Sequence, residues 1–285
     1  MAISKSVTGR KITSIKAKKS EDRPAVHRIL NVVPSKNTQT DWQFADAQNA
    51  GMVTAKAAAL PSGVDLRASW WEIGDQGSTG SCVGWASTDG VMRYELVKAG
   101  KITPSTQLSP RFTWMASKET DEFTNRPQTF IEEAGTSLKA AMDICRKYGV
   151  VRDSLLSFKV SDHMYLGNEN AFYLAASQLK ASSYINLGKN LAVWRAWLAN
   201  QKPILVALSV DDSWGKATAN KGKVDTFKPA TVRGGHAVCV VGYRSDGRFI
   251  IRNSWGTGYG DGGYAYCSES YIKAAFWNEG YGVYI

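Results

Sequence analysis

The sequence predicts an α+β protein with two lobes, one mainly helical and one built mainly from strands. Apolar residues recur at helical spacing in the first half of the chain, whereas β-branched runs bounded by glycine dominate the second half. The chain has 285 residues, 44% of them hydrophobic and 21% charged, which is enough for a substantial core. Helices and strands segregated in this way are typical of α+β folds.

The N-terminal segment is basic. Residues 1–60 contain ten Lys or Arg and four Asp or Glu, and the whole chain has a formal net charge of +10. A basic tail can bind nucleic acid or an anionic membrane. No aromatic residues alternate with these lysines, as base stacking would require. We therefore interpret residues 1–59 as a solvated leader and expect no nucleic-acid partner.

Sparse apolar residues between Ile29 and Phe44 predict that part of this leader docks on the following domain. An extended segment can cover a groove through a few spaced anchors. We expect the leader to lie over the active-site cleft, with docking of Trp42 on a remote surface as the open alternative. Thr54–Ala59 is interpreted as a linker. The expected anchors are Ile29, Leu30, Val32, Val33, Trp42 and Phe44.

The stretch from Gln76 to Ala86 predicts a tight loop that leads into a helix. Glycines and small polar residues precede Cys82, helical spacing of apolar residues follows it, and Gly100 stands where the helix would end. Unpaired backbone N–H groups and the positive end of the helix dipole favour a thiolate at that position. Cys82 is therefore a candidate nucleophile.

The central part of the chain predicts further helices. We expect them over Leu108–Lys118, Ser137–Tyr148 and Asn190–Asn200, with Phe172–Lys180 of mixed structure and Asp121–Phe130 a polar loop. In the third helix, four apolar side chains at helical spacing are interpreted as core rather than as a cofactor site. They are Leu191, Trp194, Trp197 and Leu198.

The last third predicts strands, separated by a long polar connection over Asp211–Thr231. The expected strands are Pro203–Val210, Ala237–Tyr243, Phe249–Arg252 and Tyr264–Cys267.

A nucleophilic thiol needs a base and a group that orients the base. The chain has three histidines, and His27 and His163 lie in polar or basic stretches. Only His236 opens a strong strand, and Asn253 ends another. A cleft between the two lobes would place Cys82 on one wall and His236 on the other.

These stretches together resemble the papain-like cysteine peptidases, from about residue 60 to the C-terminus. The match includes a Gln six residues before the Cys, a His-Ala-Val sequence and an Asn-Ser-Trp-Gly sequence, in family order. Other segments resemble the start of the mature domain and the bacterial branch of the family. These segments are Leu60–Arg67, Leu108–Phe112, Gly135–Leu138 and Lys147–Val150.

The resemblance implies a fold with a helical left lobe, an antiparallel β-barrel-like right lobe and an active-site cleft between them. It implies a peptidase domain over residues 60–285, with the helical lobe at about 68–180 and the β-rich lobe at about 181–285. It also implies site residues. Cys82 and His236 would form a thiolate–imidazolium pair, Asn253 would orient His236, and Gln76 would serve the oxyanion hole. Trp255 would shield the bond between His236 and Asn253, and Gly135, Gly235 and Trp255 would contact substrate.

Two positions depart from the family's signature around the nucleophile. Thr79 stands where the family has a cysteine, which removes one half of a family disulfide. Val83 replaces an aromatic residue beside the nucleophile, which puts the shape of the substrate-facing surface in doubt.

Three cysteines remain beside Cys82, namely Cys145, Cys239 and Cys267. That odd number does not predict a disulfide framework, and buried free cysteines behave as small hydrophobic residues. No Cys-x-x-Cys pair supports zinc, so we expect no metal and no cofactor. Without a signal peptide or a run of membrane-spanning length, we expect a cytoplasmic monomer, with export by a non-Sec route left open.

The expected activity is hydrolysis of peptide bonds in protein or peptide substrates, through a thioester acyl-enzyme. Two other readings stay open. The same thiol chemistry would serve an isopeptidase or a transglutaminase-like acyl transferase, because the acyl-enzyme does not determine the acceptor. A catalytically silent binding module could also keep the fold.

Overall fold

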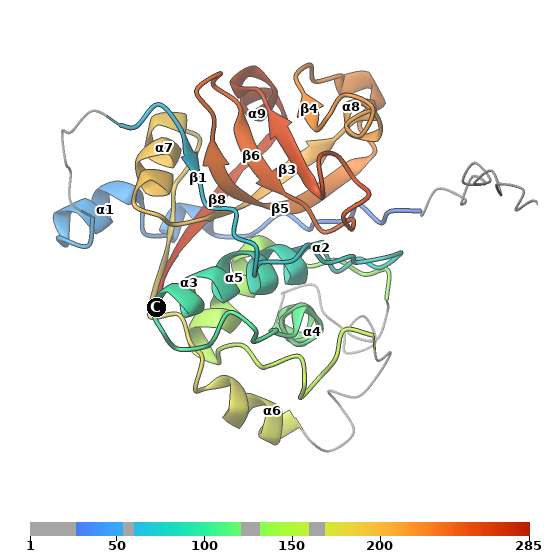
Figure 1. Cartoon of the computed structure of the whole chain (residues 1–285). Helices are drawn as coiled ribbons and strands as arrows, with labels where there is room; N and C mark the ends of the chain where they lie inside the picture. The colour runs from blue at the N-terminus through green and yellow to red at the C-terminus, as the bar shows by residue number, and fades with distance from the viewer. Residues whose placement is uncertain (1–26, 54–59, 121–131, 160–168) are drawn as a thin grey trace, which may run out of the picture.

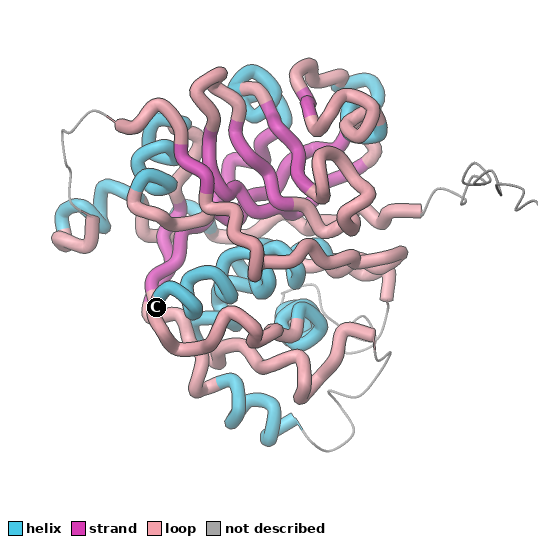
Figure 2. Tube along the Cα trace, viewed as in Figure 1, coloured by secondary structure: helices cyan, strands magenta, loops and turns pink. Residues whose placement is uncertain are grey.

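The structure is a computed structural model that describes residues 27–53, 60–120, 132–159 and 169–285. Two lobes face each other: the lower lobe in Figure 1 is built from helices, and the upper one is built around a twisted sheet. Figure 2 shows the same division, with strands above and most helices below. The predicted α+β two-lobe fold is therefore confirmed.

The helix that carries Cys82 lies at the centre of the lower lobe. It comprises α2 (Cys82–Gly84), a π-helical stretch η2 (Trp85–Met92) and α3 (Arg93–Lys98). Its buried side chains include Val83 and Leu96, neither of which is exposed. Gly100 follows with a φ of 67°, which allows the chain to leave the helix in the left-handed conformation. The predicted loop-to-helix transition at Cys82 is confirmed.

Three more helices surround this one. They are α4 (Pro110–Thr120), α5 (Leu138–Lys147) and α6 (Glu169–Ala176). Ser137 caps α5, because its side chain accepts a hydrogen bond from the backbone N–H of Ala140 at 3.2 Å. The two predicted helices that correspond to α4 and α5 are confirmed, with ends shifted by one or two residues.

The described residues form an eight-stranded sheet in the upper lobe, in the order β2-β8-β3-β5-β6-β7-β4, with β1 paired to β5. All pairs are antiparallel except β4 with β7, and β2 and β4 end the path, so the sheet is open. The four predicted strands are confirmed as β3, β5, β6 and β7. The bounds are β1 (Val64–Asp65), β2 (Ser183–Asn186), β3 (Ile204–Val210), β4 (Lys223–Val224), β5 (Gly234–Tyr243), β6 (Phe249–Arg252), β7 (Tyr264–Cys267) and β8 (Phe276–Tyr284).

Helices α7 (Leu191–Ala199), α8 (Asp212–Gly215) and α9 (Glu269–Ala275) belong to the upper lobe. The apolar face of α7 is confirmed as core, because Trp194 and Trp197 are at most 1% exposed. The expected polar connection after β3 is more structured than predicted. It contains α8, β4 and the short helix η4 (Pro229–Thr231), and the side chain of Asp211 caps α8.

A buried ionic cluster joins the two lobes behind the cleft. Asp89, on the helix that begins at Cys82, accepts a hydrogen bond from Arg93 at 3.0 Å and another from Arg252 at the end of β6. Arg93 is 1% exposed and Arg252 is 4% exposed. Removing one partner from such a buried set is strongly destabilising. The cluster therefore holds the end of β6 against this helix.

The leader crosses the molecule between the lobes, as the blue trace in Figure 1 shows. It contains the short helices η1 (Thr38–Thr40) and α1 (Phe44–Asn49). Several predictions fall outside the described residues: the tail up to residue 26, the linker at 54–59, the loop at 121–130, and His163. No helix of the described residues is long and apolar enough to cross a membrane.

Candidate active site

Cys82 begins α2 at the point where this helix meets strand β5. Its side chain is fully buried. Gly84, two residues after Cys82, permits close packing on α4, because a Cβ atom there would overlap the carbonyl oxygen of Pro110. The backbone N–H of Ala237, the residue after His236, acts to lower the pKa of the Cys82 thiol, and α2 packs against β5. The candidate nucleophile and the candidate base are thus brought to adjacent positions.

His236 is fixed from one side by Asn253. Its Nε2 lies 2.7 Å from Asn253 Oδ1, and the backbone N–H of Ser254 donates to the same oxygen at 2.8 Å. Because a backbone N–H must donate, that atom of Asn253 is the carbonyl oxygen, and Nε2 of His236 carries the hydrogen. The neutral ring then has its lone pair on Nδ1, which is buried and has no hydrogen-bond partner in the described structure.

The ionisation of Cys82 and His236 is affected by their burial. Burial raises the pKa of the Cys82 thiol to about 11, although the N–H groups of Ala237 and Val83 act to lower it. Burial also lowers the pKa of His236 to about 4, against the effect of the hydrogen bond to Asn253. Burial therefore opposes the charged form of each group, because that form would lose its hydration.

Aromatic rings enclose His236. The indole of Trp255 stacks on the imidazole, with ring centroids 4.8 Å apart and planes at 28°, and Trp255 is only 7% exposed. It therefore lies where it can shield the bond between His236 and Asn253 from water. The ring of Tyr259 packs on Trp255 with centroids 4.9 Å apart.

Trp214 of α8 is a further ring in this cluster, and the sequence did not point to it. It is fully buried and meets His236 edge-on at 5.8 Å and Trp255 at 5.6 Å. Its indole N–H donates to the hydroxyl of Tyr271 at 2.7 Å, and that hydroxyl donates to buried Asp211 at 2.9 Å. Its only sequence signal is a tryptophan inside a polar stretch.

Gln76 lies on the opposite wall, and its amide orientation is determined by two hydrogen bonds. Its Oε1 accepts from the hydroxyl of Ser254 at 2.8 Å, and its Nε2 donates to the carbonyl oxygen of Thr79 at 3.0 Å. A primary amide has two N–H groups, so one remains for a ligand. The side chain of Thr79 tightens the same loop, because its hydroxyl donates to the carbonyl oxygen of Gln76 at 2.8 Å.

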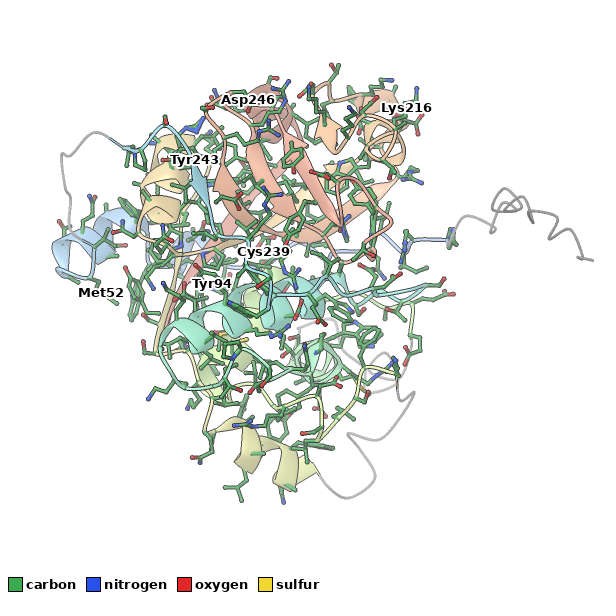
Figure 3. All side chains as sticks on the ribbon, in the orientation of Figure 1. Met52, Tyr94, Lys216, Cys239, Tyr243 and Asp246 are labelled. Atoms are coloured by element: carbon green, nitrogen blue, oxygen red, sulfur yellow. The ribbon has the colours of Figure 1, made fainter. Side chains whose placement is uncertain are left out.

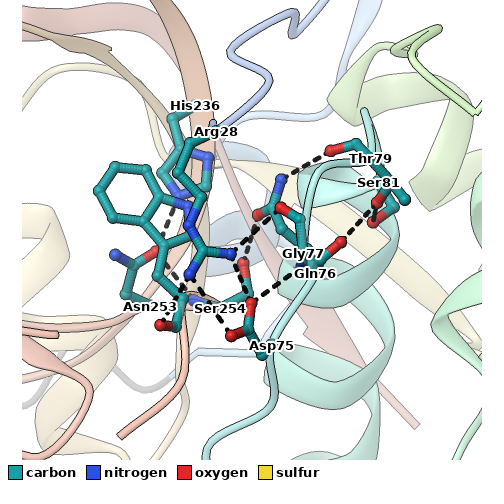
Figure 4. A network of polar contacts seen from close by, with 10 residues as sticks. Arg28, Asp75, Gln76, Gly77, Thr79, Ser81, His236, Asn253 and Ser254 are labelled. Atoms are coloured by element: carbon teal, nitrogen blue, oxygen red, sulfur yellow. Dashed lines mark hydrogen bonds and ion pairs between the residues drawn. The ribbon is translucent and has the colours of Figure 1, made fainter. Parts of the chain in front are cut away.

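Ser254 connects the two halves of the site, a role that the sequence did not indicate. Its backbone N–H holds Asn253, its hydroxyl holds the side chain of Gln76, and its carbonyl oxygen accepts from the backbone N–H of Gln76 at 2.9 Å. Figure 4 shows this polar network from His236 to the loop that precedes Cys82. The sequence indicates Ser254 only through its position between Asn253 and Trp255.

Gly135 and Gly235, two of the three predicted substrate contacts, lie on either side of the leader at Asn31. A Cβ atom at Gly135 would overlap the carbonyl oxygen of Asn31, so only glycine allows this approach. Asn31 forms a parallel β-bridge with Gly235, whose carbonyl oxygen accepts from the backbone N–H of Val32 at 3.3 Å. An extended polypeptide therefore already occupies the strip between these glycines.

Arg28 closes the other end of this strip, and nothing in the sequence predicted its contacts. Its guanidinium group forms a salt bridge with Asp75 at 2.5 Å and donates to the carbonyl oxygens of Gly77 at 3.1 Å and Trp255 at 3.2 Å. These acceptors come from both walls of the site, as Figure 4 shows. The leader thus reaches across the walls beside His236.

The leader is held further along by Asp41 rather than by the ring of Trp42. The carboxylate of Asp41 is fully buried, where it accepts from Tyr281 at 2.8 Å and pairs with Lys139. Trp42 is 59% exposed, so the expectation that its side chain anchors the leader is wrong. Its backbone carbonyl oxygen instead accepts from the N–H of Asn186, at the end of β2, at 2.8 Å. The physical reason is that a buried carboxylate with several donors holds a surface segment without a large apolar pocket.

The remaining predicted groups lie apart from this site or in the core. His27 is exposed, and the other three cysteines are free and buried. Burial raises the pKa of Cys145 to about 12, which makes it unreactive at neutral pH. The described residues contain no cluster of three or more His, Cys, Asp or Glu that could hold a metal.

Comparison with known proteins identifies similar chains. A model of the papain family of cysteine proteases matches residues 60–278. A cathepsin L-like proteinase of Fasciola hepatica is 24% identical over 216 residues, which cover 74% of this chain. The chain spans only 61% of that relative's length.

Solved structures share the fold. Xylellain, a cysteine protease from Xylella fastidiosa, superposes with a TM-score of 0.73 at 23% identity, over 90% of this chain and 96% of its own. Digestive procathepsin L 3 of Tenebrio molitor larval midgut gives a TM-score of 0.61 at 20% identity, over 81% and 72%. At these identities the superpositions establish the fold alone.

Proposed function

The chain belongs to the papain family of cysteine proteases, and from this membership we propose that it hydrolyses peptide bonds with Cys82 as its nucleophile. One observation carries the proposal: the ring of His236 is held by Asn253 at 2.7 Å, and His236 lies on β5, the strand against which the helix that begins at Cys82 packs. This arrangement presents a base to a buried thiol. A binding module would need none of these groups in this geometry.

In the proposed reaction, Nδ1 of His236 takes the thiol proton and the sulfur of Cys82 attacks the carbonyl carbon of the scissile bond. The resulting oxyanion collapses, the amine leaves with the proton that His236 returns, and a thioester remains. Water then adds to the thioester with His236 as base, which releases the acid and the free thiol. Asn253 keeps the ring in the tautomer that makes Nδ1 the base.

We assign stabilisation of the oxyanion to Gln76 and to the backbone N–H of Cys82. The support is the amide of Gln76, whose orientation is held by Ser254 and Thr79 and which keeps one N–H available. Donors held in place before the reaction stabilise developing charge at no cost of reorganisation. Removing one such donor typically lowers kcat by about a hundredfold to a thousandfold.

We assign substrate backbone contacts to Gly135 and Gly235. The leader supports this, because its extended backbone at Asn31 and Val32 fits between these glycines. An extended polypeptide of any sequence could make the same main-chain contacts. We therefore propose that the substrates are unfolded or extended segments of proteins and peptides.

Digestion of a mixed peptide library by the purified protein tests the activity, with product ends read by mass spectrometry. New free carboxyl and amino ends are expected. Addition of a primary amine separates hydrolysis from acyl transfer. Products that carry the amine, with no free acid, would establish a transferase instead, and products from branched isopeptide substrates alone would establish an isopeptidase.

We further propose that residues 28–33 of the leader block the cleft until they are displaced. Arg28 bridges the two walls beside His236, and Asn31 and Val32 occupy the strip that a substrate needs. A tethered segment competes at an effective concentration of about millimolar, even when each contact is weak. Displacing it would also return water to Cys82 and His236, which favours their charged forms.

Two leader variants test this block in the full chain. Arg28→Ala combined with Val32→Ser removes the bridge and one buried anchor, so we expect kcat/KM on a small peptide to rise at least about tenfold. Alkylation of Cys82 by iodoacetamide at pH 7 should accelerate as well. Trp42→Ala is the matched control, because its exposed side chain makes no part of the block.

Unchanged kcat/KM and unchanged alkylation in the Arg28 and Val32 variant would disprove the block. The fragment 60–285 gives a second comparison once circular dichroism establishes that it folds. A folded fragment with kcat/KM equal to or below that of the full chain would disprove it independently.

A further inference from the structure

A wide basic groove lies on the upper lobe between α8 and β4, away from the two walls of the active site. Its volume is about 520 Å³. Lys216 marks this region at the upper right of Figure 3. Four exposed lysines line the groove: Lys216, Lys221, Lys223 and Lys228.

The positive charge of this groove is not compensated within the described structure. None of the four lysines forms an ion pair with a described acidic residue within 4.0 Å. Asp225 is the acidic residue that lines the groove, and both of its oxygens are already engaged by Arg248 at 2.8 and 2.9 Å. A concave surface lined by one sign of charge concentrates the opposite charge from solution.

The groove is connected to the catalytic wall through α8. Ser213 and Lys216 line the groove, and Trp214 between them packs against His236 with ring centroids 5.8 Å apart. The hydroxyl of Thr218 accepts a hydrogen bond from the N–H of Gly260, in the loop that follows Trp255, at 2.9 Å. In Figure 1 the blue trace of the leader ends, at residue 27, on the same side of the molecule as α8 and β4.

We propose that this lysine groove binds an acidic segment of a polypeptide substrate whose scissile bond lies at Cys82. The effect on cleavage rests on the proposed peptidase function, whereas the binding does not. Carboxylates are suited to the site because lysine ammonium groups pair with them as mobile point charges without a fixed geometry. Several exposed ion pairs, each of them weak, together favour an acidic segment over a neutral one, which no single pair would do.

Two other occupants fit the groove less well. Nucleic acid would need platforms for its bases, and none of the residues that line the groove is aromatic. The protein's own N-terminal tail has the wrong charge, because residues 1–26 contain seven Lys or Arg and two acidic residues. An acidic polypeptide is therefore the partner that the charge and the lining favour.

Binding is measured on the full-length chain with Cys82→Ala, so that no probe is cleaved. A fluorescent peptide rich in Asp and Glu is titrated at low salt and followed by anisotropy. Replacing all four groove lysines by Gln should weaken its binding about tenfold, and about 0.5 M salt should abolish most of the difference. A peptide with Asn and Gln in place of Asp and Glu should bind equally weakly to both proteins.

The matched control changes four exposed lysines elsewhere to Gln, which lowers the net charge by the same amount. These lysines are Lys98, Lys101, Lys180 and Lys189. Equal loss of affinity in this control and in the groove variant would overturn the proposal, because net charge alone would then explain binding. Tighter binding of a single-stranded oligonucleotide than of the acidic peptide to the groove would also overturn it.

Kinetics of the active protein then test the peptidase proposal and the groove proposal separately. We expect an acidic extension on a peptide substrate to raise kcat/KM several-fold in the unmodified protein and in the control, but not in the groove variant. If no peptide is cleaved, the peptidase proposal fails while the binding result stands. If the acidic extension has no effect and the acidic peptide does not bind, the groove proposal fails while the peptidase proposal stands.

Discussion

Replacing Cys82 by alanine should abolish peptide cleavage, with kcat falling by about a factor of 10⁶, and should leave the fold intact. The sulfur is the atom that would form the thioester, and no other described thiol is placed to do so. The site is fully buried and already packed around a small side chain, so the loss of one sulfur atom costs little volume. The measurement is kcat on the best library peptide, with a thermal melt to establish folding.

Cys145→Ala is the matched control for this variant. Cys145 is also fully buried, but it lies in α5 and no catalytic group contacts it. Its replacement should leave kcat within a few-fold of the unmodified protein. Stoichiometric alkylation at Cys145, Cys239 or Cys267 that removes all activity while Cys82 stays unmodified would contradict the assignment of the nucleophile.

His236→Ala should lower kcat about as much as the loss of the thiol, because without a base the thiol keeps its proton at neutral pH. Asn253→Ala should lower kcat by no more than about 10⁴-fold, because the imidazole remains and only its tautomer and orientation are lost. The comparison is made on one peptide, with kcat measured from pH 5 to pH 9 for each protein. Equal losses would show that the two residues do not have these separate roles.

The Asn253 variant carries its own structural control. Oδ1 of Asn253 also accepts the backbone N–H of Ser254, which in turn holds Gln76. Ser254→Ala removes the hydroxyl contact to Gln76 and leaves the bond between Asn253 and His236 in place. If Asn253→Ala acts only through Gln76, the two variants should have the same pH profile. A shifted profile in Asn253→Ala alone assigns its effect to His236.

Much of the secondary structure follows from local patterns in the sequence. The helix after Cys82 and strands β3, β5 and β6 were predicted because apolar periodicity and flanking glycines report burial of a nearby face. Each of these elements buries an apolar face over its whole length, so the apolar periodicity can be seen in the consecutive residues of the element itself. The motif residues stand at or near the ends of these elements, so their places in the fold can be predicted from the sequence. They are Cys82, His236 and Asn253.

Other elements have no such local signal. Strand β8 (Phe276–Tyr284) contains Gly280 and Gly282 and alternates poorly, yet it is an interior strand of the sheet, paired with β2 on one side and β3 on the other. Gly282 is needed there because a Cβ atom would overlap the ring of Trp197 on α7. The requirement for glycine at position 282 therefore comes from Trp197, which lies 85 residues earlier in the sequence. Contacts across such separations leave no periodicity to read.

The class of fold, the helix start at Cys82 and the residue types that a thiol peptidase requires can be predicted from the sequence, because each is a property of a short segment. The contacts that surround and connect these residues depend on the tertiary structure. Trp214 encloses His236, Ser254 joins Asn253 to Gln76, and Arg28 reaches across both walls.

Burial in the tertiary structure also affects the ionisation of Cys82 and His236. A helix N-terminus favours a thiolate, yet burial raises the pKa of Cys82 to about 11 and lowers that of His236 to about 4. Desolvation depends on every group packed around a side chain, including a leader more than 50 residues away in sequence from Cys82. A local pattern identifies which residue ionises, whereas its charge state depends on the assembled surroundings.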